Sequence, residues 1–560
     1  MDTRRTRAAH VIPLIGQLRG YSARSARADV MAAFAIAVTL LPQGLAYGAL
    51  AGLPPAAGLY TALAAAVVFA LLTGTRFVAV GPSSTMALLT FTVVQDRAGD
   101  DGGRALALTA ALSFLVGAWC LLGAALPLQG AAEFLSSPVM LGYLAGVGIQ
   151  ILAGQAGPLL GVPTVGAEPL VSLWHVLTHL NQITPLTAMT GLGAMAALLL
   201  LRRYLPRVPG GLVVCLLAIA ISAAVDLAGR GVAVVGTVSG GLPTPAGPRV
   251  TLEDLWALLL PAAGMALIAS IETVSAVRQT VTDTPDHVPL DRETAALGTS
   301  SLASGLLGGF PPMASTSRTL SARSVGAQSQ IFQLATAGIV MFVLISGGPL
   351  IALLPMTVLA AVVMVGAPKL IDVTGFLNLW RGWRAESVIA LAAVVGVLAL
   401  GVLRGLLVAV LLSASQLLRR AARPHDALLA VYDDNEPPRE ITDGSSPHPD
   451  ILIYRVDAPL FFANARRIRQ RVLSLVTAPE PRPRGVILDA QAVFYLDATA
   501  AEALARLTAD LQGLGCRFVL TRVPEPVLAV LRANPYHDGV TRQLPVFPDV
   551  REAFTALRKQ

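Results

Sequence analysis

Residues 308–323 read GGFPPMASTSRTLSAR, and this short stretch places an arginine among hydroxyl residues just after a Pro-Pro pair. A proline followed by hydroxyl side chains is typical of the start of a helix, and here these residues are Pro312, Ser315, Thr316 and Ser317. Arg318 comes next. A charge inside a membrane segment marks a functional site, whereas an arginine in an exposed loop has no such meaning.

The composition is that of a membrane protein. Of the 560 residues, 54% are hydrophobic and 13% are charged, against about 25% charged residues in soluble domains. The net charge of +7 comes from arginines in short clusters between apolar runs, which is not the pattern of a nucleic-acid-binding surface. The three cysteines have neither metal-site nor disulfide spacing, and Walker, GxGxxG and HExxH patterns are absent. We therefore expect no metal, no cofactor, no nucleic-acid partner and no enzymatic activity.

Apolar runs fill residues 30–419. Several of the fourteen candidate spans are shorter than the roughly 20 residues of a full span, or are broken by Gly and Pro. They lie near 30–49, 56–73, 78–95, 105–127, 136–155, 185–201, 211–228, 255–276, 294–309, 313–326, 330–347, 349–366, 386–402 and 404–418. The sequence therefore predicts a polytopic α-helical membrane protein.

The basic residues indicate the orientation in the membrane. Cytoplasmic loops carry an excess of Lys and Arg, and the cluster of Arg202, Arg203 and Arg207 falls on the side of the N-terminus. The long loop 157–185 contains no Lys or Arg and is expected outside. The basic segment 1–29 has no cleavage site, so we interpret it as a cytoplasmic tail and not a signal peptide. We expect a multi-pass protein of the inner (plasma) membrane with both termini in the cytosol.

The composition changes near residue 420. Residues 420–447 are polar and rich in Pro and Asp, which predicts a linker with at most a short strand. In the segment that follows, ILIYRV (451–456) and GVILDA (485–490) are typical of strands, and AEALARLTADLQGLG is typical of an amphipathic helix. We expect a transmembrane domain over 30–419, this linker, and a cytoplasmic α/β domain over 448–560.

The stretch LLPQGLAYGALAGLPPAAGLY (40–60) places Pro42 and Gly44 inside the first span, where each weakens a helix. Such a break survives in lipid only where the freed backbone is buried in protein or lines a cavity. Gln43 and Tyr47 are four residues apart and share one helix face. They either line a polar cavity or are satisfied internally in a kinked packing helix.

A second stretch, GTRFVAVGPSSTMALLT (74–90), repeats the arrangement of the opening one. Gly-Pro is followed at once by hydroxyl residues and an apolar helix, at Pro82, Ser83, Ser84 and Thr85. A helix that begins inside the membrane points free N–H groups and its positive dipole end into the protein, which favours an anion. The alternative is an ordinary span kinked by proline.

The two proline motifs also match in spacing. Pro42 precedes Pro82 by 40 residues, and Glu272 precedes Pro312 by 40 residues. Interrupted helices at matching places in two halves point to a central binding site. The motifs therefore predict two inverted repeats, about 30–228 and 255–419.

Two charges are expected near this central site. Arg318 adds a full positive charge to two half-helix dipoles, and all three favour an anion. Glu272 is the only carboxylate of its span, and a buried carboxyl beside an anion site is a natural proton carrier. The alternatives are that Glu272 is the permanent counter-ion of Arg318, or that it faces water at the cytoplasmic end of its helix.

These motifs resemble those of a known family. LLPQGLAYGALAGLPPAAGLY resembles the signature of the SulP anion transporters, the sulfate-permease-like group, and VGPSSTMAL and GGFPPMASTSRT resemble that family's third and tenth transmembrane segments. VILDAQAVFYLDATA (486–500) resembles part of a STAS domain, which follows the transporter in that family. The resemblance implies fourteen transmembrane segments in a seven-plus-seven inverted repeat, divided into core and gate domains, and a homodimer.

The resemblance also implies a site. In the family the anion lies between the third and tenth half-helices beside the first span, which here corresponds to Gln43, Tyr47, Ser317 and Arg318. The candidate anion-binding set is completed by the hydroxyl residues of the two helix starts, Ser83, Ser84, Thr85, Ser315 and Thr316. Some members use a glutamate of the eighth span for proton coupling, which is Glu272 here.

The chain departs from the family pattern in three places. Many members have asparagine where this chain has Ala322, and some bacterial relatives have glutamate where it has Gln43, so any coupling role falls to Glu272. In phosphorylated STAS relatives a serine follows the aspartate, whereas here Asp497 is followed by alanine and then Thr499. The loop of Asp497 and Thr499 is a candidate site, with Thr499 as the substitute for that serine.

The sequence therefore predicts a secondary active transporter of a small anion, most simply sulfate by proton symport, with alternating access around a midplane site. Alternatives of the same fold are a bicarbonate or dicarboxylate transporter or an anion exchanger, because helix dipoles and one arginine recognise charge more than shape. A passive anion channel and a membrane sensor linked to the STAS domain are alternatives of other classes. The expected partners are the anion, a proton or counter-anion, the lipid bilayer and a second copy of the chain.

Overall fold

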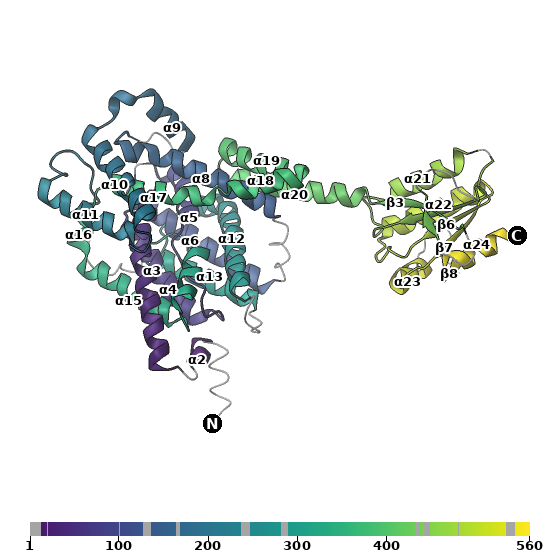
Figure 1. Cartoon of the computed structure of the whole chain (residues 1–560), viewed down its shortest axis with the longest axis horizontal. Helices are drawn as coiled ribbons and strands as arrows, with labels where there is room; N and C mark the ends of the chain where they lie inside the picture. The colour runs from purple at the N-terminus through teal and green to yellow at the C-terminus, as the bar shows by residue number, and fades with distance from the viewer. Residues whose placement is uncertain are drawn as a thin grey trace. The chain divides into compact units, whose positions relative to one another are not determined.

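The computed structural model describes residues 13–18, 21–99, 101–126, 136–163, 169–236, 247–281, 289–432, 437–441, 448–479, 481–533 and 544–559. The chain forms two compact units, a helical unit over residues 1–413 and a C-terminal unit over residues 414–560. Figure 1 shows the helices of the first and the sheet of the second. Residues 1–12 of the predicted tail, and 433–436 and 442–447 of the predicted linker, lie outside the described residues.

The helices of the first unit follow the predicted spans within a few residues. The first half contains α3 (Ala23–Leu50), α4 (Ala56–Leu72), α5 (Ser84–Ala98), α6 (Gly102–Ala125), α8 (Ser137–Leu160), α10 (Pro185–Tyr204) and α11 (Gly210–Val225). The second half contains α12 (Leu252–Val281), α13 (Leu290–Leu306), α14 (Thr316–Val325), α15 (Ile331–Ser346), α17 (Met356–Gly366), α19 (Arg384–Leu400) and α20 (Val402–Ala422). Shorter helices lie between them, namely α2 (Pro13–Gln17), α9 (Pro169–Thr178), α16 (Gly348–Ala352) and α18 (Val373–Gly382).

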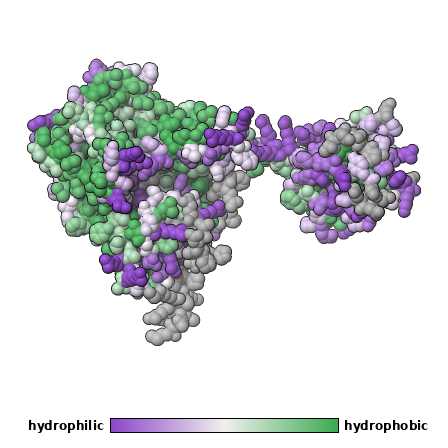
Figure 2. Space-filling view, in the orientation of Figure 1, coloured by the Kyte–Doolittle hydropathy of each residue, from purple (hydrophilic) through white to green (hydrophobic). Residues whose placement is uncertain are grey.

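The outer surface of the helical unit is apolar. Leu260, Phe342 and Leu411 are each about two-thirds exposed, and Figure 2 shows hydrophobic residues over most of the visible face of this unit. Within the described residues, seven helical segments are long and apolar enough to cross a membrane. A contiguous apolar surface of this extent suits lipid and not water. The polytopic helical fold is confirmed, while the count of fourteen spans stays a prediction.

The first span is not broken at its proline. α3 is one continuous helix that passes through Pro42, contrary to the expected interruption. α4 packs against α3 in close backbone contact. A Cβ atom placed on Gly58 of α4 would lie 1.8 Å from the carbonyl oxygen of Gly44 of α3. The glycines of this motif therefore serve the α3–α4 contact, and this packing offsets the hydrogen bond that Pro42 cannot donate.

The C-terminal unit is a six-stranded sheet covered by helices on both faces. Its strands are β4 (Arg439–Glu440), β3 (Asp426–Ala430), β5 (Ile451–Val456), β6 (Gly485–Asp489), β7 (Arg517–Thr521) and β8 (Val546–Phe547), in that order across the sheet. β5 to β8 are parallel. Side chains alternate between the faces, so Val486 and Leu488 pack with α21 (Ala465–Thr477), α22 (Ala498–Gly513) and α23 (Glu525–Ala533), and Ile487 packs with α24 (Val550–Arg558).

The sheet begins inside the segment that the sequence predicts as a linker. β3 pairs antiparallel with β5, from Asp426 opposite Val456 to Leu429 opposite Ile453. The sequence allows a short strand in this segment, but the pairing with β5 is not visible in it because β5 lies more than twenty residues later in the chain. Residues from Asp426 on therefore belong to the folded domain.

A buried carboxylate joins the beginning of α3 to the turn after α14. Asp29 is fully buried and accepts hydrogen bonds from the Tyr21 hydroxyl at 2.7 Å, the Gln328 amide at 2.6 Å, and the Ser329 hydroxyl at 2.6 Å. Burial, together with the hydrogen bond to Asp29, raises the pKa of Tyr21 to about 12. This set of contacts, the Asp29 clasp, fixes the first helix to the second half of the unit.

We expect Asp29→Asn to destabilise the helical unit by about 1–3 kcal/mol, because the new NH2 group cannot accept from the buried donors that face it. The measurement is the midpoint of thermal unfolding of the purified chain in detergent. Asp96→Asn, the same change at an exposed position, is the control. Equal midpoints for the two variants would show that the Asp29 clasp contributes nothing to stability.

Candidate anion-binding site

Two extended segments, one from each half of the helical unit, pair at the starts of α5 and α14. β1 (Val80–Gly81) is antiparallel to β2 (Met313–Ala314), with Val80 opposite Ala314 and Gly81 opposite Met313. The pairing continues through the amide of Ser315, which donates to the carbonyl of Ala79 at 2.9 Å. The two predicted helix starts are therefore brought together, although they lie more than 200 residues apart in the chain.

Serine hydroxyls cap both half-helices. Ser83 accepts from the amide of Met86 at 3.2 Å, and Ser315 accepts from the amide of Arg318 at 3.4 Å. The sequence places a proline at the first helical position, but the structure places a serine at each N-cap, since a hydroxyl can satisfy a free amide and a proline cannot. The other amides of each first turn have no partner within their helix and carry partial positive charge.

Arg318 links the two half-helices. Its side chain is almost fully buried, at 6% exposed, and its guanidinium donates to the carbonyl of Pro82 at 3.1 Å. It interacts electrostatically with Tyr47 of α3, whose hydroxyl also interacts with the side chain of Ser84. Of the predicted residues, the structure thus brings together Tyr47, Ser84 and Arg318.

The other predicted residues lie around this group. Ser317 is exposed, with its hydroxyl 3.3 Å from that of Ser315, while Thr85 is buried in the first turn of α5. Gln43 is half-buried one turn before Tyr47 on α3. A polar surface therefore extends from the buried guanidinium to the open side of α14.

Glu272 lies on the helix beside the site but does not neutralise Arg318. α12 packs against β2 and α14, and Glu272 is half-buried on it. Among the side chains that the structure describes, no carboxylate forms an ion pair with Arg318, so a permanent Glu272–Arg318 salt bridge is not present in this conformation. The neighbours of the charged Arg318 guanidinium are thus the carbonyl of Pro82 and the phenol of Tyr47.

Three buried polar residues that the sequence analysis missed hold β1 in place. Thr319 accepts from the amide of Ala79 at 3.0 Å, and Gln330 donates to the carbonyl of Val78 at 3.0 Å. Gln333 donates to the carbonyl of Val80 at 3.4 Å. The sequence could have indicated Gln330 and Gln333, because two glutamines three residues apart at the start of an apolar span need polar partners.

A cavity of about 950 Å³ lies between α3 and α14 on one side and α10, α11 and α17 on the other. We call it the vestibule. Gln43 and Ser321, one turn beyond Ser317, line it, and so do three basic residues, Arg202, Arg207 and Lys369. A concave surface with one sign of charge raises the local concentration of the opposite ion. The vestibule is therefore suited to lead anions toward the start of α14.

The candidate residues of the C-terminal unit have different surroundings. Asp497 caps α22 by accepting from the amide of Ala500 at 2.8 Å, and it also accepts from the amide of Phe462 at 2.8 Å. Thr499 is exposed in the first turn of the same helix. Asp497 thus has a structural task, and the role of Thr499 stays a prediction.

Within the described part of the chain, no group of three His, Cys, Asp or Glu could hold a metal ion.

Comparison with known sequences finds a family match for each of the two units. Residues 27–393 match the sulfate permease family, and residues 446–553 match the STAS domain. A probable sulfate transporter of Mycobacterium tuberculosis is 36% identical over 550 residues, which is 98% of each chain. The low affinity sulfate transporter 3 of Stylosanthes hamata is 26% identical, over 98% of this chain and 90% of that protein.

Solved structures share the fold. The murine Slc26a9 anion transporter in the inward-facing state superposes with a TM-score of 0.91 at 20% identity, covering 98% of this chain and 94% of that one. The transmembrane domain of the cyanobacterium bicarbonate transporter BicA superposes with a TM-score of 0.61 at 21% identity, covering 70% of this chain and 98% of that one. At these identities the likeness establishes the arrangement of the helices.

We expect Arg318→Gln to weaken anion binding about 10- to 100-fold, because a charge-assisted contact contributes roughly 1.5–3 kcal/mol. The measurement is equilibrium binding of radiolabelled sulfate to the purified chain in detergent. Arg230→Gln, the same change at an exposed arginine outside the site, is the control. Unfolding midpoints of both variants separate lost binding from lost folding, and a folded Arg318→Gln that binds sulfate like the wild type would refute this assignment.

Proposed function

The chain belongs to the sulfate permease family, and we propose that it is a secondary active transporter that carries a small oxyanion, most simply sulfate, together with protons. The observation that carries this proposal is the buried guanidinium of Arg318, which bridges the starts of two half-helices without a carboxylate partner in the described structure. Two helix N-termini and one full positive charge at a single place favour an anion. The names of the relatives from M. tuberculosis and S. hamata support sulfate as that anion.

The packing of the helices supports alternating access. α3, α4, α6, α12, α13 and α15 pack mainly among themselves, and α8, α10, α17 and α19 form a second group. We assign the first group, with the site, to the core and the second to the gate. The vestibule lies where α3 and α14 face α10, α11 and α17. A shift of the core against the gate would close this opening and expose the site at the other end.

Glu272 is our proposed proton carrier. It is half-buried on α12, the helix that packs against β2 and α14, and in the described structure it has no ion pair with Arg318 to hold it ionised. Ionised, it adds a negative charge near the anion site; protonated, it removes that repulsion. Proton binding would therefore favour anion binding, which is the linkage that symport requires.

The remaining assignments rest on the family resemblance. We place the protein in the inner (plasma) membrane as a homodimer, with both termini and the STAS domain in the cytosol. The transport activity itself needs no catalytic residue and no cofactor, because binding and release at a central site suffice.

The proposal is tested by uptake of radiolabelled sulfate into proteoliposomes with and without an inward proton gradient. We expect accumulation above equilibrium only with the gradient, and competition by unlabelled anions that fit the site. A panel of sulfate, bicarbonate and fumarate identifies the preferred substrate. Large unitary currents in planar bilayers with no dependence on a proton gradient would instead indicate a channel.

Glu272→Gln keeps the shape of the side chain but cannot bind or release a proton. We expect this variant to lose gradient-driven accumulation while it still exchanges internal for external sulfate at equal pH. Glu253→Gln, an exposed position at the start of the same helix, should behave like the wild type. Unchanged accumulation by Glu272→Gln would assign the proton to another group.

A further inference from the structure

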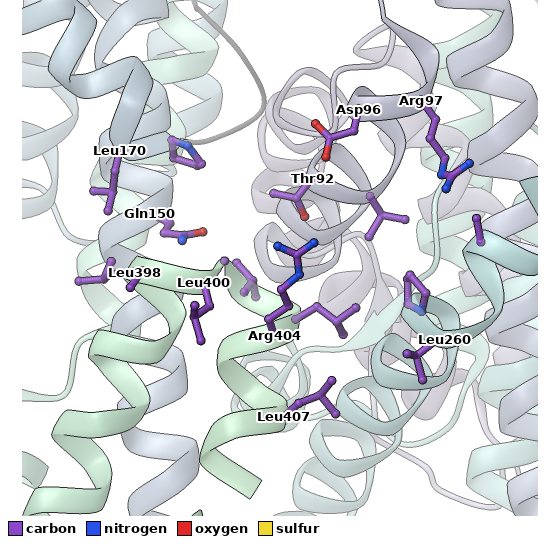
Figure 3. Close-up of a pocket in the computed structure, with 18 residues that line it drawn as sticks. Thr92, Asp96, Arg97, Gln150, Leu170, Leu260, Leu398, Leu400, Arg404 and Leu407 are labelled. Atoms are coloured by element: carbon purple, nitrogen blue, oxygen red, sulfur yellow. The ribbon is translucent and has the colours of Figure 1, made fainter. Parts of the chain in front are cut away.

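A second cavity of about 660 Å³ lies among α5, α8, α12, α19 and α20, with α9 at its rim. Figure 3 shows the side chains that line it. α5 and α19 end at this cavity, and α12 and α20 begin there. On the proposed topology this end of the helices faces the exterior, so we call it the exterior cavity.

The exterior cavity is the repeat-related counterpart of the vestibule. By their order in the two halves, the predicted inverted repeat pairs α3 with α12, α5 with α14, α8 with α17, α10 with α19 and α11 with α20. The vestibule is lined by α3, α10, α11, α14 and α17, and each partner helix, α12, α19, α20, α5 and α8, lines the exterior cavity. The same set of repeat elements thus lines both cavities.

The two half-helices point to the two cavities. α5 and α14 both begin at the β1–β2 pair. The second half of α14 contributes Ser321 and Ser324 to the vestibule, and the second half of α5 contributes Thr92 and Asp96 to the exterior cavity. Each half-helix therefore runs from the β1–β2 pair to one of the two cavities.

Arg404 supplies positive charge to the exterior cavity. It is an exposed residue of α20, and Figure 3 shows its side chain extending toward Thr92 and Asp96 of α5. In the described structure it forms no ion pair, whereas Arg97, the other arginine of the lining, pairs with Asp254 at 3.8 Å. The lining has two arginines, Arg97 and Arg404, against one carboxylate, Asp96. Asp254 is shared between Arg97 and Arg104, so the formal charge around the cavity is positive.

Gln150 adds a polar group on the α8 side. It is 2% exposed, and its amide nitrogen donates to the carbonyl of Val397 on α19 at 2.6 Å. Its oxygen is buried without a hydrogen-bond partner, and Figure 3 shows the amide directed toward the cavity. A buried acceptor without a donor is unfavourable, and a water molecule in a wider cavity would supply that donor.

We infer that the exterior cavity is the outer antechamber for the transported oxyanion, and that Arg404 draws the anion into it. This inference rests on the proposed function, because it assigns the cavity to the same transport path. The vestibule has three basic residues of its own, so loss of Arg404 affects one side of the membrane only.

A first test does not depend on transport. Thr92→Cys places a thiol on the cavity wall, and the natural cysteines Cys120, Cys215 and Cys516 are buried. In right-side-out membrane vesicles we expect the charge of Arg404 to raise the rate at which an anionic methanethiosulfonate reagent labels Thr92→Cys, relative to the rate of a cationic reagent. We expect Arg404→Gln to lower this ratio of labelling rates at least about threefold. Arg230→Gln is the matched control. An unchanged ratio, or no labelling of Thr92→Cys from outside, overturns the inference.

The second test compares sulfate uptake by right-side-out and inside-out vesicles. We expect Arg404→Gln to raise the KM for exterior sulfate about threefold to tenfold, with the interior KM and the maximal rate unchanged. An equal change on both sides, or none, overturns the role of Arg404 while the proposed function stands. A wild-type chain that takes up no sulfate contradicts the proposed function, and the thiol-labelling result then still decides whether the cavity attracts anions.

Discussion

The hydrogen bonding of four extended residues, Val80–Gly81 with Met313–Ala314, is the constraint on which the helical unit depends. Backbone that leaves the helical conformation inside an apolar unit must find every partner within the protein. Here the partners come from the opposite half of the chain and from the side chains of Thr319, Gln330 and Gln333. Neither half can begin its half-helix at this depth alone, so the site exists only where both halves have folded together.

This arrangement also bears on what the proposed site would recognise. The charge of Arg318 is fixed against the carbonyl of Pro82, and the capped helix starts add oriented amides to it. Such a site senses negative charge strongly and shape weakly, because the donors converge on one place and do not surround the ligand. In the proposed site, discrimination among anions of equal charge would therefore fall to the exposed Ser317 and the half-buried Gln43.

Much of this could be predicted from local patterns. Apolar runs located the helices, and the repeated proline-serine motif located both half-helix starts, because hydropathy and capping are encoded within a few residues. The continuity of α3 through Pro42 could not be predicted, since it depends on packing against α4. The contacts of Thr319 and Gln330 with β1 span about 240 and 250 residues, and no local pattern contains them. The pairing of β3 with β5 could not be predicted for the same reason, because β5 lies across a polar segment.

The Asp29 clasp has a consequence for the order of synthesis. Its carboxylate leaves the ribosome early, whereas the amides of Gln328 and Ser329 that it accepts from follow 299 and 300 residues later. At about 5–20 residues per second this interval is roughly 15–60 seconds. During that time α3 carries a carboxylate without these two partners. A chain that stops before residue 328 therefore leaves the carboxylate of Asp29 without these two donors, and a chain that stops before β2 also leaves β1 unpaired.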